Sequence, residues 1–426
     1  MKHLSANLKD SLTVGGVALL LFGPFLGLQL TNSGSGNLGL AARPELLAIA
    51  VGLTILARFL LLLWQDHRVT RKPSLKLAAT VTKSGKYVAP ALLVFTVIMP
   101  LIPGIDNSYV DLGVLIMTYV MLGWGLNIVV GLAGLLDLGY VAFYAVGAYG
   151  FALLSHYFGL SFWECLPLCG ILAAAWGIFL GFPVLRLRGD YLAIVTLAFG
   201  EIIRLVITNW VDFTGGPNGI SDIPHPTFFG LTFDMAGGPG TVSDFFHVDP
   251  DPSQRTMYLY YIILALALLT NWVTLRLRRQ PLGRAWEALR EDEIACRSLG
   301  INLRNTKLSA FAIGAMFGGF AGCFFATRQA FISPDSFTFI ESATVLAIVV
   351  LGGAGSQLGV ALAAIVMIGV PALLQDLQIY RMLIFGIALV AIMVLKPRGF
   401  ISTRRPSVSL GDAKIIGADM ISEGHG

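Results

Sequence analysis

Long apolar runs separated by short polar stretches dominate the chain. A helix that crosses the hydrocarbon core of a bilayer needs about 20 mostly apolar residues, and about twelve runs approach that length. They are 12–30, 45–64, 88–103, 110–131, 138–157, 163–185, 191–210, 257–277, 308–327, 338–353, 357–375 and 382–396. The tenth and eleventh runs are separated by glycines and alternatively form a broken or re-entrant pair. The pattern predicts an all-α polytopic membrane protein with about 10–12 transmembrane helices.

The composition supports this fold class. Hydrophobic residues make up 56% of the 426 residues and charged residues only 13%, with a mean hydropathy of +0.76. Soluble domains usually carry about 25% charged residues, so the excess apolar surface is expected to face lipid. The net charge of +4 is too small and too dispersed to indicate nucleic-acid binding.

Basic residues fall on one side of the membrane if every run crosses once. They follow the second, sixth, eighth and twelfth runs, at Arg68, Arg71, Lys72, Lys76, Lys83, Lys86, Arg186, Arg188, Arg276, Arg278, Arg279, Lys396, Arg398, Arg404 and Arg405. The positive-inside rule then places both termini in the cytoplasm. We expect the chain to lie in the inner membrane. The first run is read as a spanning helix, with a signal peptide as the alternative.

The longest external loop, 211–252, contains six aspartates and no lysine or arginine. It either docks a soluble partner by charge complementarity or simply lacks basic residues, as external loops do. The chain divides into an N-terminal two-span module with a basic cytoplasmic linker (1–86), a core of about ten spans (87–400) and a cytoplasmic tail (401–426).

A polar cytoplasmic stretch between the eighth and ninth runs has helical periodicity. Pro281 suits the first turn of a helix and Gly300 suits its stop, so a helix is predicted over 281–299. Its apolar side chains recur at helical spacing, and Trp286 and Leu289 are interpreted as anchors in the groove of a cytoplasmic partner. The alternative is an interfacial helix that lies on lipid.

Charged residues within the seventh run are a second candidate for function. Glu201 lies near its middle, where an unpaired charge costs about 3 kcal/mol or more, and Arg204 one turn later is expected to pair with it. Asp190 and Thr208 fall on the same helical stripe. The stripe is interpreted either as part of a translocation path or gate, or as a structural ion pair.

Glycines mark two other features. Gly314, Gly318 and Gly322 have the small-xxx-small spacing of closely packed membrane helices. The stretches 352–355 and 214–219, with Gly352, Gly353, Gly215, Gly216 and Asn218, are expected to break or end helices and to expose backbone groups to a solute, or to be plain turns.

The sequence lacks the motifs of several enzymatic chemistries. The sequence has no Gly-x4-Gly-Lys-[Ser/Thr] loop for ATP hydrolysis, no His-Glu-x-x-His zinc motif and no nucleophile elbow. The cysteines are interpreted as small membrane-helix residues: Cys165, Cys169, Cys296 and Cys323. We therefore expect no enzymatic activity, no metal and no cofactor bound by this chain.

Five stretches resemble the branched-chain amino acid permeases of the ABC importer class. They are 131–149, 188–204, 213–220, 283–300 and 341–356. The extra N-terminal pair of spans resembles the longer M-type subunit of Gram-negative bacteria. The resemblance implies a ten-span core of the cobalamin-importer type with an extra N-terminal helix pair. It also implies three kinds of partner: a homologous second permease subunit, two cytoplasmic ATPases that use ATP, and a periplasmic amino-acid-binding protein.

The resemblance makes the helix 281–299 a coupling helix seated on an ATPase. Its expected contacts are Pro281, Leu282, Gly283, Arg284, Ala285, Trp286, Leu289, Glu293 and Gly300. The expected residues of the path or gate are Asp190, Glu201, Arg204, Thr208, Gly215, Gly216, Asn218, Glu341, Gly352 and Gly353. The alternatives are a urea or short-chain amide permease and an ion-coupled secondary transporter that uses Glu201.

Overall fold

The structure is a computed structural model of the whole chain, and it divides into two units, Met1–Leu93 and Val94–Gly426. The residues that it describes are 16, 19, 28–33, 37–42, 44–45, 48, 51–52, 54–55, 90–102, 105–184, 187, 189–228, 230–231, 233, 241, 244–245, 251–373, 386 and 390.

The first unit contains an antiparallel hairpin that the sequence analysis did not predict. Strands β1 (Leu28–Ser33) and β2 (Asn37–Ala42) pair from Leu28 opposite Ala42 to Ser33 opposite Asn37. The run 12–30 was predicted as one helix, and its last three residues belong to β1 instead. Alternating polar and apolar residues, Gln29 and Thr31 among leucines, favour this extended pairing. Most of the predicted span 45–64 lies outside the described residues.

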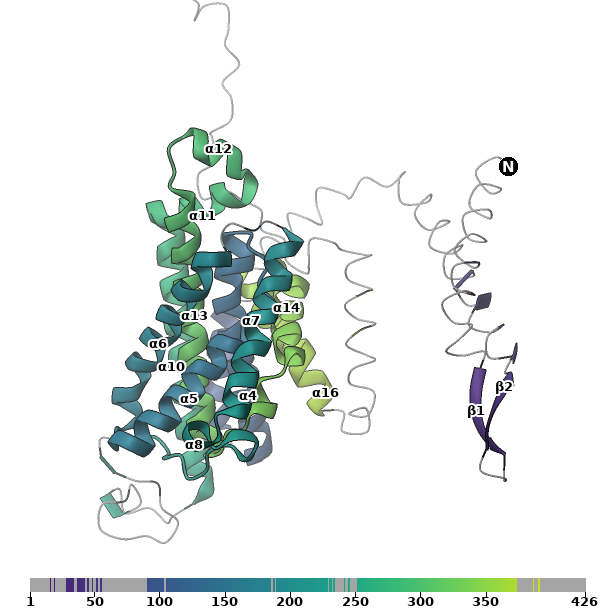
Figure 1. Cartoon of the computed structure of the whole chain (residues 1–426). Coiled ribbons are helices and arrows are strands. Elements are labelled where there is room, and N and C mark those ends of the chain that lie inside the picture. Colours follow the sequence, from purple (N-terminus) through teal and green to yellow (C-terminus); the bar gives the residue numbers. More distant parts are fainter. Residues whose placement is uncertain are drawn as a thin grey trace, which may run out of the picture. The chain divides into compact units, whose positions relative to one another are not determined.

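The second unit is a bundle of helices (Figure 1). The α-helices whose bounds lie within its described residues include α4 (Asn107–Leu126), α5 (Val141–Phe158), α6 (Phe162–Val184), α7 (Asp190–Asn209), α8 (Val211–Thr214), α10 (Pro252–Arg279), α11 (Pro281–Glu291), α12 (Glu293–Ser298), α13 (Leu303–Gln329), α14 (Phe339–Gly352), α15 (Gln357–Ala364) and α16 (Val370–Leu373). Shorter elements are the 3-10 turns η1 (Met99–Leu101), η3 (Gly216–Asn218) and η4 (Pro334–Phe337) and the π-helical turns η2 (Asn127–Leu132) and η5 (Ile365–Gly369).

Within the described residues, seven helices are long and apolar enough to cross a membrane. They are Asn107–Leu132, Val141–Phe158, Phe162–Pro183, Asp190–Asn209, Ser253–Arg279, Leu303–Gln329 and Pro334–Gly352. Two shorter apolar helices, Pro90–Leu101 and Gln357–Ala372, correspond to the predicted runs 88–103 and 357–375. The polytopic helical fold is therefore confirmed, while the predicted span 382–396 lies almost entirely outside the described residues.

Helix α13 is the centre of the bundle and packs against α4, α5 and α6. Its glycines permit this packing. A Cβ on Gly322 would lie 2.1 Å from the carbonyl oxygen of Tyr144 in α5, and one on Gly314 would lie 3.2 Å from the carbonyl oxygen of Gly125 in α4. The small-xxx-small spacing is thus used for close backbone approach, as the sequence analysis expected.

An unwound segment, residues 133–140, interrupts the bundle between η2 and α5. The predicted span 138–157 starts too early, because its helix begins only at Val141. The interruption was not predicted because Leu135, Leu136 and Leu138 look like membrane-helix residues, although the chain is not helical here.

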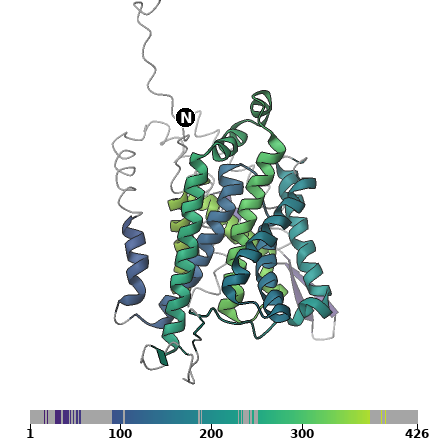
Figure 2. The ribbon, with the colours of Figure 1, turned by 90° about the vertical axis from the view of Figure 1, so that its left-hand side faces the viewer.

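The polar connections lie at opposite ends of the bundle. Helices α11 and α12 stand together at one end, and α8 lies at the other (Figure 1). The view turned by 90° shows the same separation, with the long helices running between the two ends (Figure 2).

Candidate coupling segment and translocation path

The polar stretch predicted as one helix, 281–299, is a pair of helices. Pro281 occupies the first turn of α11, which ends at Glu291. Asp292 then adopts an extended conformation, and its carboxylate accepts hydrogen bonds from the backbone nitrogens of Ile294 at 2.7 Å and Ala295 at 3.0 Å. This aspartate is the N-cap of α12, so the prediction of a continuous helix was wrong. Gly300 follows α12 with a φ of +79°, as expected of a helix stop.

Trp286 fixes α11 to the bundle. Its side chain is 0% exposed, and its indole nitrogen donates to the carbonyl oxygen of Thr306 at 3.0 Å and to the Ser309 hydroxyl at 3.1 Å. Leu289 is also buried. The sequence analysis interpreted Trp286 and Leu289 as anchors in a partner, but both side chains are already covered by this chain. Helical periodicity identifies the apolar face of a helix and not the surface that covers it.

Two ion pairs join the helix pair to the flanking spans. Arg278 of α10 lies 2.6 Å from the carboxylate of Glu287 in α11. Lys307 of α13 lies 2.9 Å from the carboxylate of Glu293 in α12, and the Lys307 side chain is only 5% exposed. Glu293 was predicted as an ATPase contact and serves as an internal partner here. These two ion pairs were not predicted, because Lys307 lies 14 residues from Glu293 in the sequence and Glu287 lies 9 residues from Arg278.

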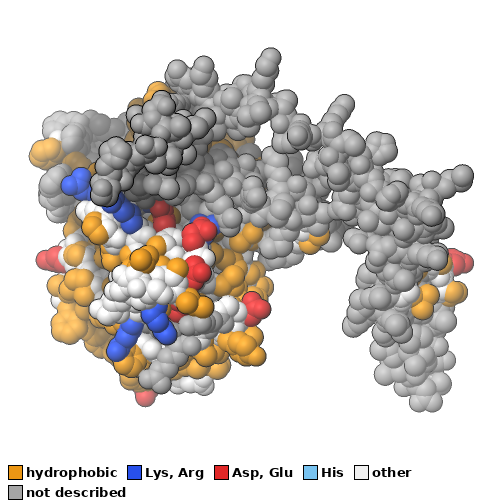
Figure 3. Space-filling view, turned by 90° about the horizontal axis from the view of Figure 1, so that it is seen from above, with side chains coloured by type: hydrophobic (Ala, Val, Ile, Leu, Met, Phe, Trp, Pro, Cys, Tyr) orange, Lys and Arg blue, Asp and Glu red, His pale blue; other side chains and the backbone are white. Residues whose placement is uncertain are grey.

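The remaining face of the helix pair is open. Ile294 and Leu299 are 69% and 80% exposed, although both are large and apolar. The other exposed residues of the segment 281–300 are polar or small: Pro281, Arg284, Glu291, Asp292, Ala295, Arg297, Ser298 and Gly300. Figure 3 looks down on this end of the bundle and shows basic and acidic side chains interspersed with apolar ones.

Leu282 and Ala285 are half-buried, and Gly283 is buried where α11 turns away from α10. A Cβ on Gly283 would lie 2.3 Å from the carbonyl oxygen of Leu277. Gly283 is therefore required by this tight turn between α10 and α11 rather than by a surface contact.

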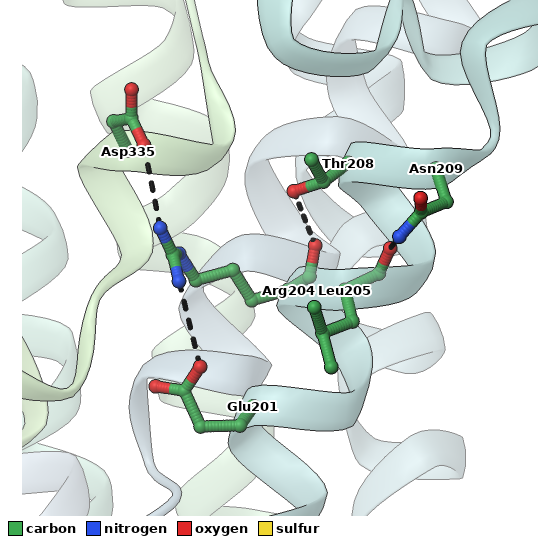
Figure 4. A network of polar contacts seen from close by, with 6 residues as sticks. All are labelled: Glu201, Arg204, Leu205, Thr208, Asn209 and Asp335. Atoms are coloured by element: carbon green, nitrogen blue, oxygen red, sulfur yellow. Dashed lines mark hydrogen bonds and ion pairs between the residues drawn. The ribbon is translucent and has the colours of Figure 1, made fainter.

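The charged stripe of α7 forms an ion-pair network (Figure 4). Arg204 lies 3.5 Å from Glu201, as predicted, and its other terminal nitrogen lies 3.4 Å from Asp335 in η4. The Arg204 and Glu201 side chains remain 31% and 39% exposed. Charges that lie in the middle of a span and are open on one side need a polar neighbour or a water-filled cavity.

The other members of the predicted stripe do not join this network. Thr208 donates to the backbone oxygen of Arg204 at 2.8 Å, and Asp190 is exposed at the opposite end of α7. Gly215 and Gly216 have φ values of +74° and +57° and form the turn after α8, with Asn218 exposed in η3. This turn is anchored where Ile220 pairs with Ile332, next to the η4 segment that carries Asp335.

Glu341 lines a small pocket inside the bundle. The hydroxyl of Tyr119 in α4 donates to its carboxylate at 2.5 Å. The pocket is lined by Tyr119, Leu122, Tyr140, Val141, Tyr144, Glu341 and Val345. One acidic group, phenolic hydroxyls and aliphatic walls are therefore brought together from α4, α5 and α14.

Gly352 and Gly353 lie at the predicted break between α14 and α15. A Cβ on Gly352 would lie 2.5 Å from the backbone nitrogen of Val360, and Gly353 has a φ of +101°. The two glycines let the chain reverse its direction while α14 and α15 remain in contact. The break is confirmed, while its predicted contact with a solute stays a prediction.

These features together define a polytopic membrane permease: a bundle of spans with an unwound segment, an internal polar pocket and an amphipathic helix pair at one end. The family model described as "Branched-chain amino acid transport system / permease component" matches residues 108–393, and the chain belongs to this family. A second model, described as a domain of unknown function, matches residues 6–99.

Relatives support the assignment over most of the chain. The high-affinity branched-chain amino acid transport system permease protein LivM of Escherichia coli is 56% identical over 332 residues, covering 77% of this chain and 78% of the relative. LivM of Salmonella typhimurium is 56% identical over 338 residues, covering 78% and 79%. A probable LivM of Methanocaldococcus jannaschii is 27% identical over 256 residues, covering 55% and 68%. No solved structure matches the chain.

Proposed function

We propose that the chain is the membrane-spanning permease subunit of an ATP-driven importer of leucine, isoleucine and valine. It sits in the inner membrane with both termini in the cytoplasm. A homologous permease completes the pore, two ATPases bind the cytoplasmic side, and a periplasmic binding protein delivers the amino acid. The chain itself binds no cofactor and hydrolyses no ATP, so nucleotide chemistry belongs to the ATPases.

This proposal rests mainly on the structure of the helix pair α11–α12. The pair presents two exposed aliphatic side chains, Ile294 and Leu299, and is held rigidly to α10 and α13 by Trp286 and two ion pairs. Exposed apolar side chains interspersed with both signs of charge (Figure 3) suit a protein groove better than anionic lipid. The docking residues proposed here are therefore the exposed side chains of α12 and its C-cap, and not the buried Trp286.

Rigid attachment supports alternating access. When the ATPases close on ATP, a displacement of α11–α12 must move α10 and α13, because the ion pairs and the buried indole connect them. Helix α13 is the centre of the bundle, so its movement rearranges the packing around the pocket at Glu341. ATP state and pore state are then linked by a coupling free energy.

The pocket at Glu341 has room for only about one water molecule in this conformation and must widen to admit a solute, but its lining matches the chemistry of an amino acid. The Glu341 carboxylate offers a partner for the ammonium group, and Leu122, Val141 and Val345 offer an apolar surface for a branched side chain. Urea and short amides can also donate hydrogen bonds to Glu341, so it is the aliphatic lining that favours a branched-chain amino acid over these solutes. We place the solute path along this pocket and along α7.

The half-exposed ion pair of α7 supports the presence of a second permease subunit in the transporter. Glu201 and Arg204 open onto the outside of this chain, where lipid contact is costly. A neighbouring subunit or the pore it encloses covers them in the complete transporter. An ion-coupled transporter that uses Glu201 is disfavoured, because Arg204 already neutralises that carboxylate.

Uptake of radiolabelled leucine by proteoliposomes tests the proposal. The complete transporter is compared with and without ATP on the cytoplasmic side, for wild type, for the double variant Ile294→Asp with Leu299→Asp, and for the conservative control Ile294→Val with Leu299→Met. ATP-dependent uptake that is lost only in the aspartate variant is expected. Uptake that follows a proton gradient without ATP, or that urea competes for as well as isoleucine does, contradicts it.

A further inference from the structure

Arg290 of α11 points into the bundle and lies across the unwound segment. Its aliphatic stem covers Gly134, where a Cβ would lie 2.8 Å from the Arg290 Cγ and 3.1 Å from its Cβ. Gly134 has a φ of +72°, so both its conformation and its neighbour require glycine. The Arg290 guanidinium donates from Nη1 to the carbonyl oxygen of Gly131.

The same guanidinium lies beside the break between α14 and α15. A Cβ on Gly355 would lie 3.4 Å from Nη1 of Arg290 and 3.5 Å from the carbonyl oxygen of Gly131. The backbone nitrogen of Gly355 donates to the side-chain oxygen of Asn127 in η2 at 2.8 Å. Three glycines from two interruptions of the bundle, Gly131, Gly134 and Gly355, thus form a cradle for one arginine.

From this cradle the unwound segment leads to the middle of the spans. The backbone nitrogen of Leu138 donates to the Thr196 hydroxyl of α7 at 3.0 Å. The Tyr140 hydroxyl donates to the carbonyl oxygen of Gly314 of α13 at 2.9 Å, and the backbone nitrogen of Val141 donates to the Ser342 hydroxyl of α14 at 2.9 Å. Tyr140 and Val141 also line the pocket that holds Glu341.

We propose that Arg290 is the positioning residue that transmits movement of α11–α12 through residues 133–140 to the pocket at Glu341. The inference deepens the proposed function and rests on it. A segment without the regular hydrogen-bond ladder of a helix bends at lower cost than a helix, so a pull at Gly131 moves it against α7 and α14. Arginine suits the task, because its long aliphatic stem covers Gly134 while its guanidinium donates to the carbonyl oxygen of Gly131.

The first test measures leucine uptake per ATP hydrolysed in the complete transporter, for wild type, Arg290→Gln and Arg304→Gln. Arg304 is the matched control, because it lies on the same end of the bundle but stacks on Phe182, 4.2 Å from the ring centre. We expect Arg290→Gln to hydrolyse ATP and to lose about tenfold in uptake per ATP, a size typical of coupling between sites. Arg304→Gln is expected to match wild type.

A second measurement separates transmission from folding. The four native cysteines are buried, so Leu136→Cys, at a residue that is 40% exposed on the unwound segment, provides a single reactive thiol. Its labelling rate with an impermeant maleimide is expected to change when a non-hydrolysable ATP analogue is added. Arg290→Gln is expected to abolish that change while leaving assembly with the ATPases intact.

Wild-type uptake per ATP in Arg290→Gln, with an unchanged nucleotide effect at position 136, overturns the proposal. If Arg290→Gln does not assemble, Arg290→Met replaces it, because methionine keeps an unbranched stem over Gly134 and removes the donor to Gly131, and full coupling in that variant also overturns the proposal. Failure of the proposed function gives a different result: the wild-type transporter itself shows no ATP-dependent uptake.

Discussion

A single imidazole joins three segments at the end of the bundle that carries α8. Nδ1 of His225 lies 2.8 Å from the carbonyl oxygen of Thr327 at the end of α13, and Nε2 lies 3.2 Å from Nη1 of Arg255 in α10. A carbonyl only accepts, so Nδ1 carries the proton, and Nε2 must be bare to accept from the guanidinium. These contacts therefore require a neutral ring.

Acidification is expected to weaken this junction. Burial and the nearby Arg255 lower the pKa of His225 below its usual 6.5, although the contact with Thr327 opposes the shift. The unfolded chain then binds more protons, so the stabilisation is present above pH 6.5 and is lost as the pH falls below that value. The thermal midpoint of unfolding is expected to decrease when the pH is lowered from about 7.5 to about 5. The decrease is expected to be smaller in His225→Gln. An equal fall in both proteins contradicts the assignment.

Single residues also mark where sequence reasoning stops. The pairing of Glu201 with Arg204 was predictable, because it depends on spacing along one helix. Asp335 lies 131 residues from Arg204, and Gly131 lies 159 residues from Arg290, so neither contact has a local signal. Glu341 was identified from resemblance alone, and its phenolic partner Tyr119 was not.

At the scale of elements, hydrophobicity locates helices well and their ends poorly. The run 308–327 identified α13, but the helix extends from Leu303 to Gln329 because polar residues at its ends continue the backbone pattern. The capping signal at Asp292 was present in the sequence, and it was hidden by the good helix formers on both sides. Residues 133–140 show the opposite error, since an apolar sequence there is not a helix.

Disrupting the close packing between α13 and α5 is expected to lower the stability of the protein measurably. In Gly322→Ala the new Cβ would meet the carbonyl oxygen of Tyr144 at 2.1 Å and the nitrogen of Ala148 at 2.7 Å, and both are backbone atoms that cannot turn aside. We expect destabilisation of about 1–3 kcal/mol or more, measured as a lower thermal midpoint in detergent.

Gly150→Ala on α5 is the matched control for this substitution. Its Cβ would meet only side-chain atoms, at 3.6 Å, so an unchanged midpoint is expected. Equal effects of the two substitutions would show that helix propensity, and not the contact with α5, determines the result.

At the scale of the whole molecule, the proposed orientation predicts opposite accessibility for the two ends of the bundle. Leu299→Cys on the exposed face of α12 is expected to react with an impermeant maleimide in inside-out vesicles and not in intact spheroplasts. Ser221→Cys, exposed after η3, is expected to show the reverse. The buried native cysteines give a low background. Labelling of both positions from one side contradicts the topology.

The Lys307–Glu293 pair has a practical consequence for purification. Exposed charges such as Arg284 and Arg297 are screened at 1 M salt, where the Debye length is about 3 Å, whereas a lysine that is 5% exposed is largely shielded from ions. A concentrated salt wash should therefore weaken the charged contacts of peripheral proteins with this face and leave α12 fastened to α13. Apolar contacts at Ile294 and Leu299 are not screened, so proteins that resist the wash are those held mainly by these two side chains.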